Sequence, residues 1–155
     1  MTDMEKEQKY GQLVKEATSL LDGESDMIAN MANLAALIHE TMGFWWTGFY
    51  IVRADKDGKE QLVLGPFQGP IACTRIALGR GVCGTSWQRR ETVVVPDVEK
   101  FPGHIACSSE SRSEIVVPVF NGDKVSAVLD IDSRDLNTFD EADARHLEHI
   151  VKLLY

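Results

Sequence analysis

The residues of this chain most suited to chemistry lie in a short polar stretch, Gly103–Glu114, which holds Cys107 with His104 and Arg112 nearby. The stretch is rich in small and polar residues and lies between Pro102 and an apolar run, so it is predicted to be a loop. Cationic neighbours and free backbone N–H groups stabilise a thiolate, which is the nucleophilic form of cysteine. The stretch therefore predicts a reactive Cys107, and an incidental free cysteine is the alternative interpretation.

Three cysteines, Cys73, Cys83 and Cys107, are separated by ten and twenty-four residues, and no C-x-x-C pair is present. An odd number is unusual for a secreted disulfide scaffold, which favours an intracellular protein whose thiols are kept reduced. Structural zinc sites usually contain C-x-x-C pairs, so a zinc site formed by the three cysteines and His104 is the weaker hypothesis. The cysteines are predicted to perform redox chemistry.

Two carboxylates interrupt or end an apolar segment. Asp130 and Asp132 are two residues apart in a predicted strand, so their side chains point to the same face. Burial of Asp130 costs free energy unless a partner or a ligand satisfies it. Asp130 is therefore predicted to be a site residue, and a hydrogen-bonded structural aspartate is the alternative.

A glycine-rich turn, Gly79–Gly84, leads into a predicted short helix and contains Cys83. Turns of this kind at helix N-termini bind anions, but the Gly-Lys-Ser/Thr ending of a nucleotide-binding loop is missing. The turn predicts a site for a small carboxylate or an oxyanion. It also predicts a lowered pKa for Cys83, because a helix N-terminus stabilises a thiolate.

An aromatic segment, Phe44–Val52, is typical of a strand and is followed by a turn signal at Asp55–Lys59. Alternation along the strand divides its side chains between two faces. One face, with Trp46, Gly48 and Tyr50, or the other, with Trp45, Phe49 and Ile51, must belong to the core. The remaining face is a candidate aromatic wall of a small pocket, in which Gly48 leaves room between two rings.

The remaining periodicities predict the elements that position these residues. Apolar residues at helical spacing predict helices over Tyr10–Leu21 and Ile28–Met42, and a third after Thr138–Glu141, which reads as a capping box. Strands are predicted over residues 44–52, 61–64, 71–78, 92–95, 115–120 and 125–131. Residues 65–70 are predicted to be a loop that breaks the sheet. The order predicts an α+β fold in one domain, residues 1–155, with an antiparallel sheet and the long helices on one face.

Composition excludes several classes of function. The chain has 155 residues and a formal net charge of -8, with 44% hydrophobic and 26% charged residues. Nucleic-acid surfaces need clustered Lys and Arg, and no basic stripe is present. The N-terminal residues are polar, and no apolar run is long enough to cross a bilayer. The sequence therefore predicts a cytoplasmic protein that binds neither nucleic acid nor membrane.

Several motifs, taken together, resemble the free methionine-(R)-sulfoxide reductases, which are stand-alone GAF-domain enzymes. The resemblance runs from the aromatic hairpin to the last helix and includes all three cysteines. The motifs are Leu64–Gly69, Gly79–Thr85, Gly103–Cys107, Ser113–Val116 and Val128–Ser133.

The resemblance implies a GAF-like fold and the reduction of free L-methionine (R)-sulfoxide to methionine, with thioredoxin restoring the enzyme. It implies Cys107 as the nucleophile and Cys73 or Cys83 as the resolving cysteine. Neither a cofactor nor a metal ion is implied, and a homodimer stays open. The remaining implied site residues are the carboxylates Glu114, Asp130 and Asp132, and Trp46 and Tyr50 around the substrate's methyl group.

Two alternatives belong to other classes of protein. One is a GAF sensor that binds a small ligand without catalysis, against which the missing output domain argues. The other is a thiol redox switch with no small substrate. Formation of free methionine from its sulfoxide would separate the three hypotheses.

Overall fold

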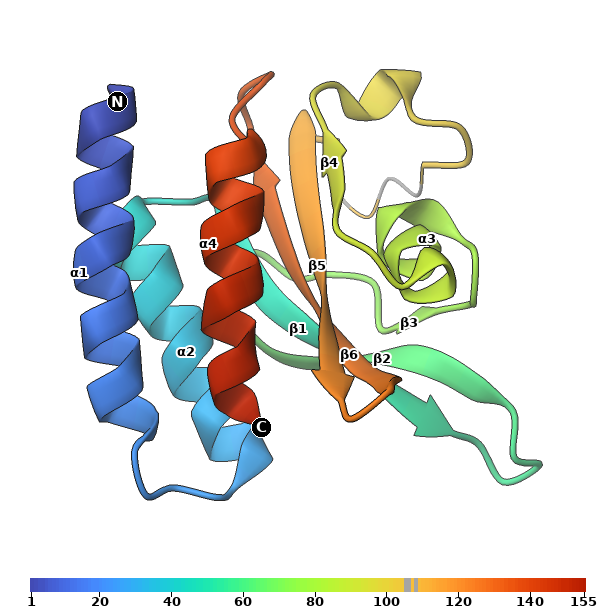
Figure 1. Ribbon diagram of the computed structural model, residues 1–155. Coiled ribbons are helices and arrows are strands. Elements are labelled where there is room, and N and C mark those ends of the chain that lie inside the picture. The colour runs from blue at the N-terminus through green and yellow to red at the C-terminus, as the bar shows by residue number, and fades with distance from the viewer. Residues whose placement is uncertain (105–106, 108) are drawn as a thin grey trace.

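A six-stranded antiparallel sheet lies at the centre of the molecule, with helices on both faces (Figure 1). The computed structural model describes residues 1–104, 107 and 109–155, so Ile105, Ala106 and Ser108 of the predicted reactive loop lie outside the described residues. The helices are α1 (Asp3–Leu21), α2 (Met27–Met42), α3 (Gly81–Arg89) and α4 (Glu141–Val151), with 3-10 turns η1 (Val98–Lys100) and η2 (Lys152–Leu154). The strands are β1 (Trp46–Ala54), β2 (Glu60–Gln68), β3 (Arg75–Ile76), β4 (Val93–Val95), β5 (Ser113–Asn121) and β6 (Lys124–Ser133), in the order β3-β2-β1-β6-β5-β4. The α+β prediction is confirmed.

Helices α2 and α4 pack against one face of the sheet, and α1 packs on them from the outside, as Figure 1 shows. Strand side chains alternate between faces, and one set packs against the helices. This set joins the apolar stripes of the helices in one core. Its strand members include Phe49, Ile115, Val117, Val119, Ala127, Leu129 and Ile131. The prediction of long helices on a single face is therefore confirmed.

The capping residues explain where these helices begin and end. The Asp26 carboxylate accepts a hydrogen bond from the Ala29 backbone N–H (2.9 Å), and Gly43 ends α2 at a φ of 71°. The capping box of α4 was predicted around Thr138 with Glu141, which is wrong. Asp140 caps α4 and Asp143 completes the box.

Helix α3 lies on the opposite face of the sheet. Its side chains pack there with those of the sheet, including the short edge strands β3 and β4, in a second apolar cluster. Trp46, Tyr50, Val116 and Val128 contribute to it from the three central strands. Because side chains two residues apart share a face, the acidic residues of β5 and β6 point to this side as well. The candidate site must therefore lie between the sheet and α3.

Two predicted boundaries on this side are wrong. Strand β2 continues through the segment predicted as a loop, because the pairing between β1 and β2 shifts register between Gly48 and Tyr50. This bulge leaves Gly65 and Pro66 out of the regular pairing, so the proline does not end the strand. The strand predicted over residues 71–78 shrinks to Arg75–Ile76, and the segment before it is a loop.

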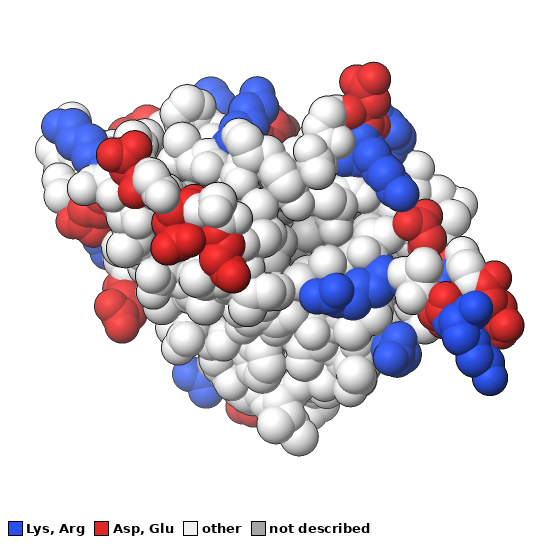
Figure 2. Space-filling model, turned by 90° about the horizontal axis from the view of Figure 1, so that it is seen from below, with Lys and Arg blue, Asp and Glu red and all other residues white. Residues whose placement is uncertain are grey.

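Charges on the face shown in Figure 2 lie in several separate groups. On the face shown in Figure 2, Lys and Arg lie in separate groups near Asp and Glu, and no basic stripe crosses this face. No helix within the described ranges has the length and apolar character needed to span a membrane.

Candidate active site

Three carboxyl side chains meet on the face of the sheet below α3. In the antiparallel pairing of β5 and β6, Glu114 lies opposite Asp132 and Val116 lies opposite Asp130. The three acids therefore share a face and are direct or diagonal neighbours. Glu114 and Asp130 are each only 6% exposed, and Asp132 is partly buried. The sequence predicted this face for Asp130 and Asp132, and the structure confirms it.

A cavity of about 60 Å³ opens above these acids. One water needs roughly 10–15 Å³ in the same measure, so the cavity has room for a small molecule and not only for solvent. Its wall combines acids, aromatic rings and two of the cysteines. The lining residues are Trp45, Trp46, Tyr50, Ile71, Ala72, Ile76, Gly81, Val82, Cys83, His104, Cys107, Ser111, Glu114, Asp130 and Asp132.

The acids hold protons more tightly than exposed carboxyl groups do. Burial and the charges of Asp130 and Asp132 raise the pKa of Glu114 well above its usual 4.5. Burial and the charge of Asp130 likewise raise the pKa of Asp132 well above 3.8. Burial also raises the pKa of Asp130, but hydrogen bonds from Glu114, Cys83 and Asp132 act in the opposite direction. Of the three acids, Asp130 is thus the one whose ionised form is stabilised by hydrogen bonds from its acidic neighbours.

One carboxylate oxygen at the centre of this cluster has no partner. Among the described residues, nothing forms a hydrogen bond with Asp130 Oδ1, although this atom is buried. Asp132 by contrast accepts a hydrogen bond from Ser111 Oγ (3.0 Å), and His104 Nε2 lies 3.8 Å from Glu114 Oε1. A buried and unpaired acceptor costs about 1–3 kcal/mol, so its retention indicates a position kept for a ligand.

The cysteines divide into a bonded pair and one free thiol. Cys73 and Cys107 form a disulfide with their Cα atoms 5.5 Å apart, and Cys83 is free and buried. The zinc hypothesis that used all three cysteines is therefore not supported, since two of them are bonded to each other. Cys107 and Cys83 both line the cavity, and the disulfide joins the Cys107 loop to the loop before β3.

Two predictions about charge near the cysteines are wrong. The pKa of Cys83 was expected to be lowered, but burial and the negative charges of Asp130, Glu114 and Asp132 raise it well above 9.0. Helix α3 does begin at Gly81, yet its N-terminus does not outweigh these effects. His104 was expected to be cationic, but burial lowers its pKa below 6.5 despite the attraction of Asp130.

The aromatic residues of β1 build the cavity wall and also hold the loop that carries Cys73. The Trp46 indole N–H donates to the Pro70 carbonyl (2.8 Å), and the Tyr50 hydroxyl donates to the Cys73 carbonyl (2.9 Å). The rings of Trp46 and Tyr50 stack with centroids 6.1 Å apart. Two distant segments, β1 and the loop before β3, are thereby fixed relative to each other.

Gly48 leaves room for the Trp46 ring, which also stacks on the Phe67 ring with centroids 5.2 Å apart. A Cβ atom at this position would lie 2.6 Å from the Trp46 ring and would also clash with Phe67, so only glycine fits. The prediction that Gly48 leaves room between rings is confirmed, with Phe67 as the second ring in place of Tyr50. Trp45 was predicted on the face opposite Trp46, but it lies just before β1 and lines the cavity.

Sequence reasoning missed several lining residues. Ile71 is 91% exposed at the cavity mouth, and its predicted place in a strand hid its loop position. Ser111 lies in the polar stretch already suspected of chemistry, and its hydroxyl could have been considered as a partner for a carboxylate. Ile76 and Val82 contribute apolar wall, which spacing alone cannot distinguish from core.

Comparison with known proteins identifies the class of protein to which this arrangement belongs. Residues 27–154 match the GAF domain family. GAF domain-containing protein A of Dictyostelium discoideum is 56% identical over 149 residues, which cover 96% of this chain and 92% of that protein.

Two further comparisons are more specific. The free methionine-R-sulfoxide reductase of Escherichia coli is 42% identical over 152 residues, covering 97% of this chain and 89% of that protein. The structure of free methionine-R-sulfoxide reductase from Neisseria meningitidis in complex with its substrate superimposes with a TM-score of 0.91 at 48% identity, covering 99% of this chain and 89% of that one. The chain therefore belongs to the free methionine-(R)-sulfoxide reductases, a family of GAF-domain proteins, as its motifs predicted.

Proposed function

We propose that this protein reduces free L-methionine (R)-sulfoxide to methionine, with Cys107 as the nucleophile and Cys73 as the resolving cysteine. The observation that carries the proposal is the Cys73–Cys107 disulfide beside a cavity floored by three carboxyl groups. A disulfide here is the expected product of one catalytic cycle. The homologue from Neisseria meningitidis is described as bound to its substrate, and its close structural similarity to this chain supports the proposed activity.

The first chemical step needs a nucleophile and an acid together. The Cys107 thiolate attacks the sulfoxide sulfur while a carboxylic acid, Glu114 or Asp132, gives a proton to the sulfoxide oxygen. The S–O bond to the substrate breaks, the oxygen passes to Cys107 as a sulfenic acid, and methionine leaves. The raised pKa values of Glu114 and Asp132 suit this role, because a carboxyl group must still hold its proton near neutral pH to donate it.

The second step regenerates a stable state of the cysteines. The Cys73 thiol attacks the Cys107 sulfenic acid, a disulfide forms and the oxygen leaves as water. A dithiol then opens the disulfide by exchange, and thioredoxin is the reductant that we propose. Cys83 is buried, free and poorly acidic, so it does not take part in this cycle.

The substrate's own charges suit the cavity. Its ammonium group can pair with Asp130, whose Oδ1 lacks a partner within the described part of the chain. Its carboxylate can accept hydrogen bonds from backbone N–H groups in the first turn of α3, where Gly81 and Val82 line the cavity. Trp46 and Tyr50 offer an apolar surface for the terminal methyl group.

The direct test is incubation of the protein with dithiothreitol and free methionine sulfoxide, followed by measurement of free methionine. We expect the (R) epimer to be consumed and the (S) epimer to remain. A GAF sensor or a thiol switch would bind or oxidise without releasing methionine, so the absence of methionine would refute the proposed reaction.

A competition experiment tests the role assigned to the charged groups. Free methionine (R)-sulfoxide competes at equal concentration with its N-acetylated, amidated form, which lacks both the ammonium and the carboxylate. A site that pairs buried polar groups rejects an analogue without them by roughly 10⁴-fold, because its own groups stay unpaired. Similar rates for the two compounds would contradict the charged-pocket assignment even if the cysteine chemistry were correct.

A further inference from the structure

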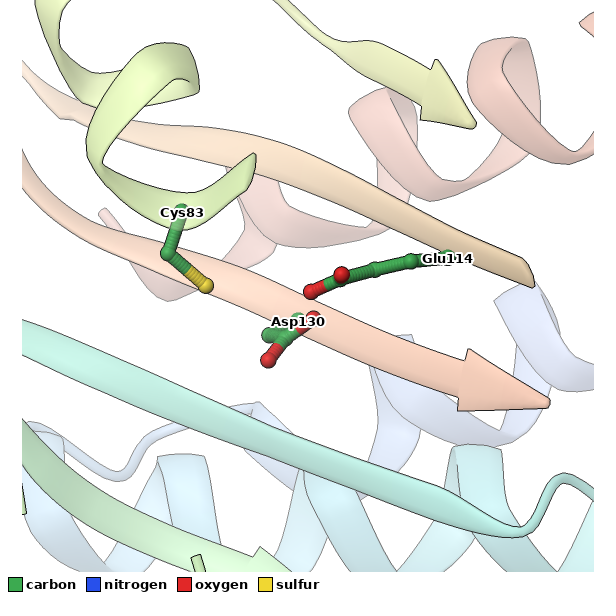
Figure 3. Close-up of side chains that lie close together, drawn as sticks. All are labelled: Cys83, Glu114 and Asp130. Carbon is green, nitrogen blue, oxygen red and sulfur yellow. The ribbon is translucent and has the colours of Figure 1, made fainter. Parts of the chain in front are cut away.

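The free thiol Cys83 belongs to a cluster whose donors suit a metal ion. In Figure 3 its sulfur, on α3, points toward the carboxyl groups of Glu114 on β5 and Asp130 on β6. The Cys83 Sγ and one oxygen of each carboxyl group all lie within 4.8 Å of one another, and all three residues are buried. The proposed reduction of the sulfoxide gives Cys83 no role.

Two further observations indicate that this cluster can bind a ligand. Asp130 is 6% exposed, and its Oδ1 has no hydrogen-bond partner in the described ranges. His104 lines the same cavity, with its Nε2 only 3.8 Å from Glu114 Oε1, so an imidazole nitrogen is at hand as a fourth donor. A sulfur and two carboxylate oxygens therefore converge from three separate segments, and an imidazole nitrogen lies beside one of these oxygens.

The donor set selects the kind of ion. Thiolate and imidazole ligands favour Zn²⁺ and related borderline ions, whereas Mg²⁺ and Ca²⁺ prefer oxygen ligands alone. Zinc also accepts four-coordinate sites of mixed sulfur, nitrogen and oxygen donors, at distances of about 2.0–2.3 Å. The donor atoms lie within 4.8 Å of one another, so binding would require them to move closer together around the ion.

We propose that Cys83, Glu114 and Asp130, with His104 as the fourth donor, form a site for Zn²⁺ that inhibits the protein reversibly. The inhibitory part rests on the proposed function, because the ion would occupy the carboxylates that bind and protonate the sulfoxide. Cys83 stays free when Cys73 and Cys107 are joined, so the site exists in the disulfide form of the protein.

The binding test uses Co²⁺ as a probe, because Zn²⁺ has no useful absorption spectrum. Protein in the disulfide form, free of added thiols, is titrated with Co²⁺. We expect a near-ultraviolet thiolate-to-cobalt band that saturates at one ion per chain and disappears when Zn²⁺ is added. The absence of such a band would overturn the proposal.

Variants locate the ligands. Cys83→Ser should abolish the band. Glu114→Gln or Asp130→Asn should weaken Co²⁺ binding by at least about tenfold, because changing even a residue that only hydrogen-bonds a metal ligand typically lowers metal affinity by about 10–100-fold. Glu91→Gln is the matched control, because Glu91 is exposed and is not among the residues that line the cavity. A band that persists in Cys83→Ser, or equal losses in Glu114→Gln and Glu91→Gln, would refute the site. If Cys83→Ser does not fold, the Co²⁺ affinities of Glu114→Gln and Asp130→Asn still test the site.

A separate kinetic arm tests inhibition. One turnover of reduced, desalted protein is followed by the methionine formed, with and without Zn²⁺. We expect Zn²⁺ to slow the turnover at low sulfoxide concentration but not at saturating concentration, and a chelator to restore the rate. If no methionine forms but the cobalt band appears, the proposed function fails and the metal site stands. If methionine forms and no band appears, only the metal site falls.

Discussion

Two buried aspartates, one on each side of the sheet, show how differently the two faces are built. Asp143 on α4 is 1% exposed and Asp130 on β6 is 6% exposed. Asp143 accepts hydrogen bonds from the Tyr10 hydroxyl (2.6 Å), the Lys6 ammonium (2.7 Å) and the Asp140 backbone N–H (2.9 Å). Its charge is fully matched by partners from its own and a neighbouring helix, so its role is structural.

Asp130 has the opposite surroundings. Its neighbours are two further acids and a thiol, and one of its oxygens has no hydrogen-bond partner within the described ranges. Burying a charge in this way lowers stability unless a ligand completes the site. Burial alone therefore does not separate structural from functional carboxylates. What separates them is whether the fold itself supplies the partners.

The largest effect on activity is expected from a change at Cys107, the proposed nucleophile. Cys107→Ser should reduce methionine formation to the rate of dithiothreitol without protein, because a hydroxyl is too weakly acidic to replace a thiolate. Under the same reducing conditions its unfolding midpoint should equal that of the parent protein. Methionine formation is measured for this variant and for Cys83→Ser. An undiminished rate in Cys107→Ser together with loss in Cys83→Ser would move the nucleophile to Cys83.

Removing a proton donor should cost less than removing the nucleophile. Glu114→Gln keeps the shape of the side chain but cannot give a proton to the departing oxygen, so we expect a rate roughly 10²-fold lower. Asp132→Asn should behave similarly, and Glu91→Gln should match the parent protein. The rates are compared at saturating sulfoxide. Rates near the parent value in both site variants would leave the proton donor unidentified.

The sequence was sufficient for most of the fold because the two periodicities are strong. The helical stripes of α1 and α2 mark most of the residues that these helices bury, and the apolar runs of β1, β5 and β6 mark the strands. Errors fall where a local rule competes with tertiary packing. Pro66 suggested a break, but a bulge in the pairing of β1 and β2 carries the strand past it. The capping box was placed on Thr138, although its hydroxyl donates to Ser133 Oγ (2.6 Å) and the cap is Asp140.

Positions of the site residues could be predicted, but their electrostatics could not. Strand alternation put Asp130 and Asp132 on one face, whereas the addition of Glu114 depends on the register between β5 and β6. The helix N-terminus suggested an acidic Cys83 thiol. Its pKa is raised instead, because burial and three carboxyl groups from other strands act on the same sulfur. Such effects sum over segments that only the folded chain brings together.

The two aspartates can be compared directly by making both into asparagine. Asp143→Asn should lower the free energy of unfolding by roughly 2 kcal/mol, because the Lys6 ammonium and Tyr10 hydroxyl lose a charged partner. Asp130→Asn should not lower it, since it removes a buried charge that lacks a full set of partners. Activity per folded molecule should show the reverse pattern. For both variants, urea denaturation gives the free energy of unfolding and the methionine assay gives the activity. Equal destabilisation by the two changes would show that Asp130 is structural as well.

The smallest expected effect is a difference in how stability depends on pH on the two faces. Glu114 has a pKa well above 4.5 in the folded protein, so the folded state binds the proton more tightly than the unfolded chain does. Its contribution to stability is therefore complete below about pH 4.5 and is lost as the pH rises through the folded pKa. Glu114→Gln cannot titrate and should lack this loss. The slope involved is at most about 1.4 kcal/mol per pH unit for one proton.

Asp140 on the helix face should show the opposite sign. Slight burial acts to raise its pKa, but the backbone N–H of Asp143 and the charge of Lys6 outweigh this and lower it below 3.8. Its contribution is present above about pH 3.8 and is lost as the pH falls through the folded pKa. Asp140→Asn keeps a capping side chain and removes only this titration.

Urea denaturation of the parent protein and both variants between about pH 3 and about pH 8 tests the comparison. The parent should lose its advantage over Glu114→Gln toward neutral pH and its advantage over Asp140→Asn toward acid pH. Parallel profiles for the parent and Glu114→Gln would mean that Glu114 ionises in the folded protein as an exposed glutamate does, which would remove the physical basis for its role as the proton donor.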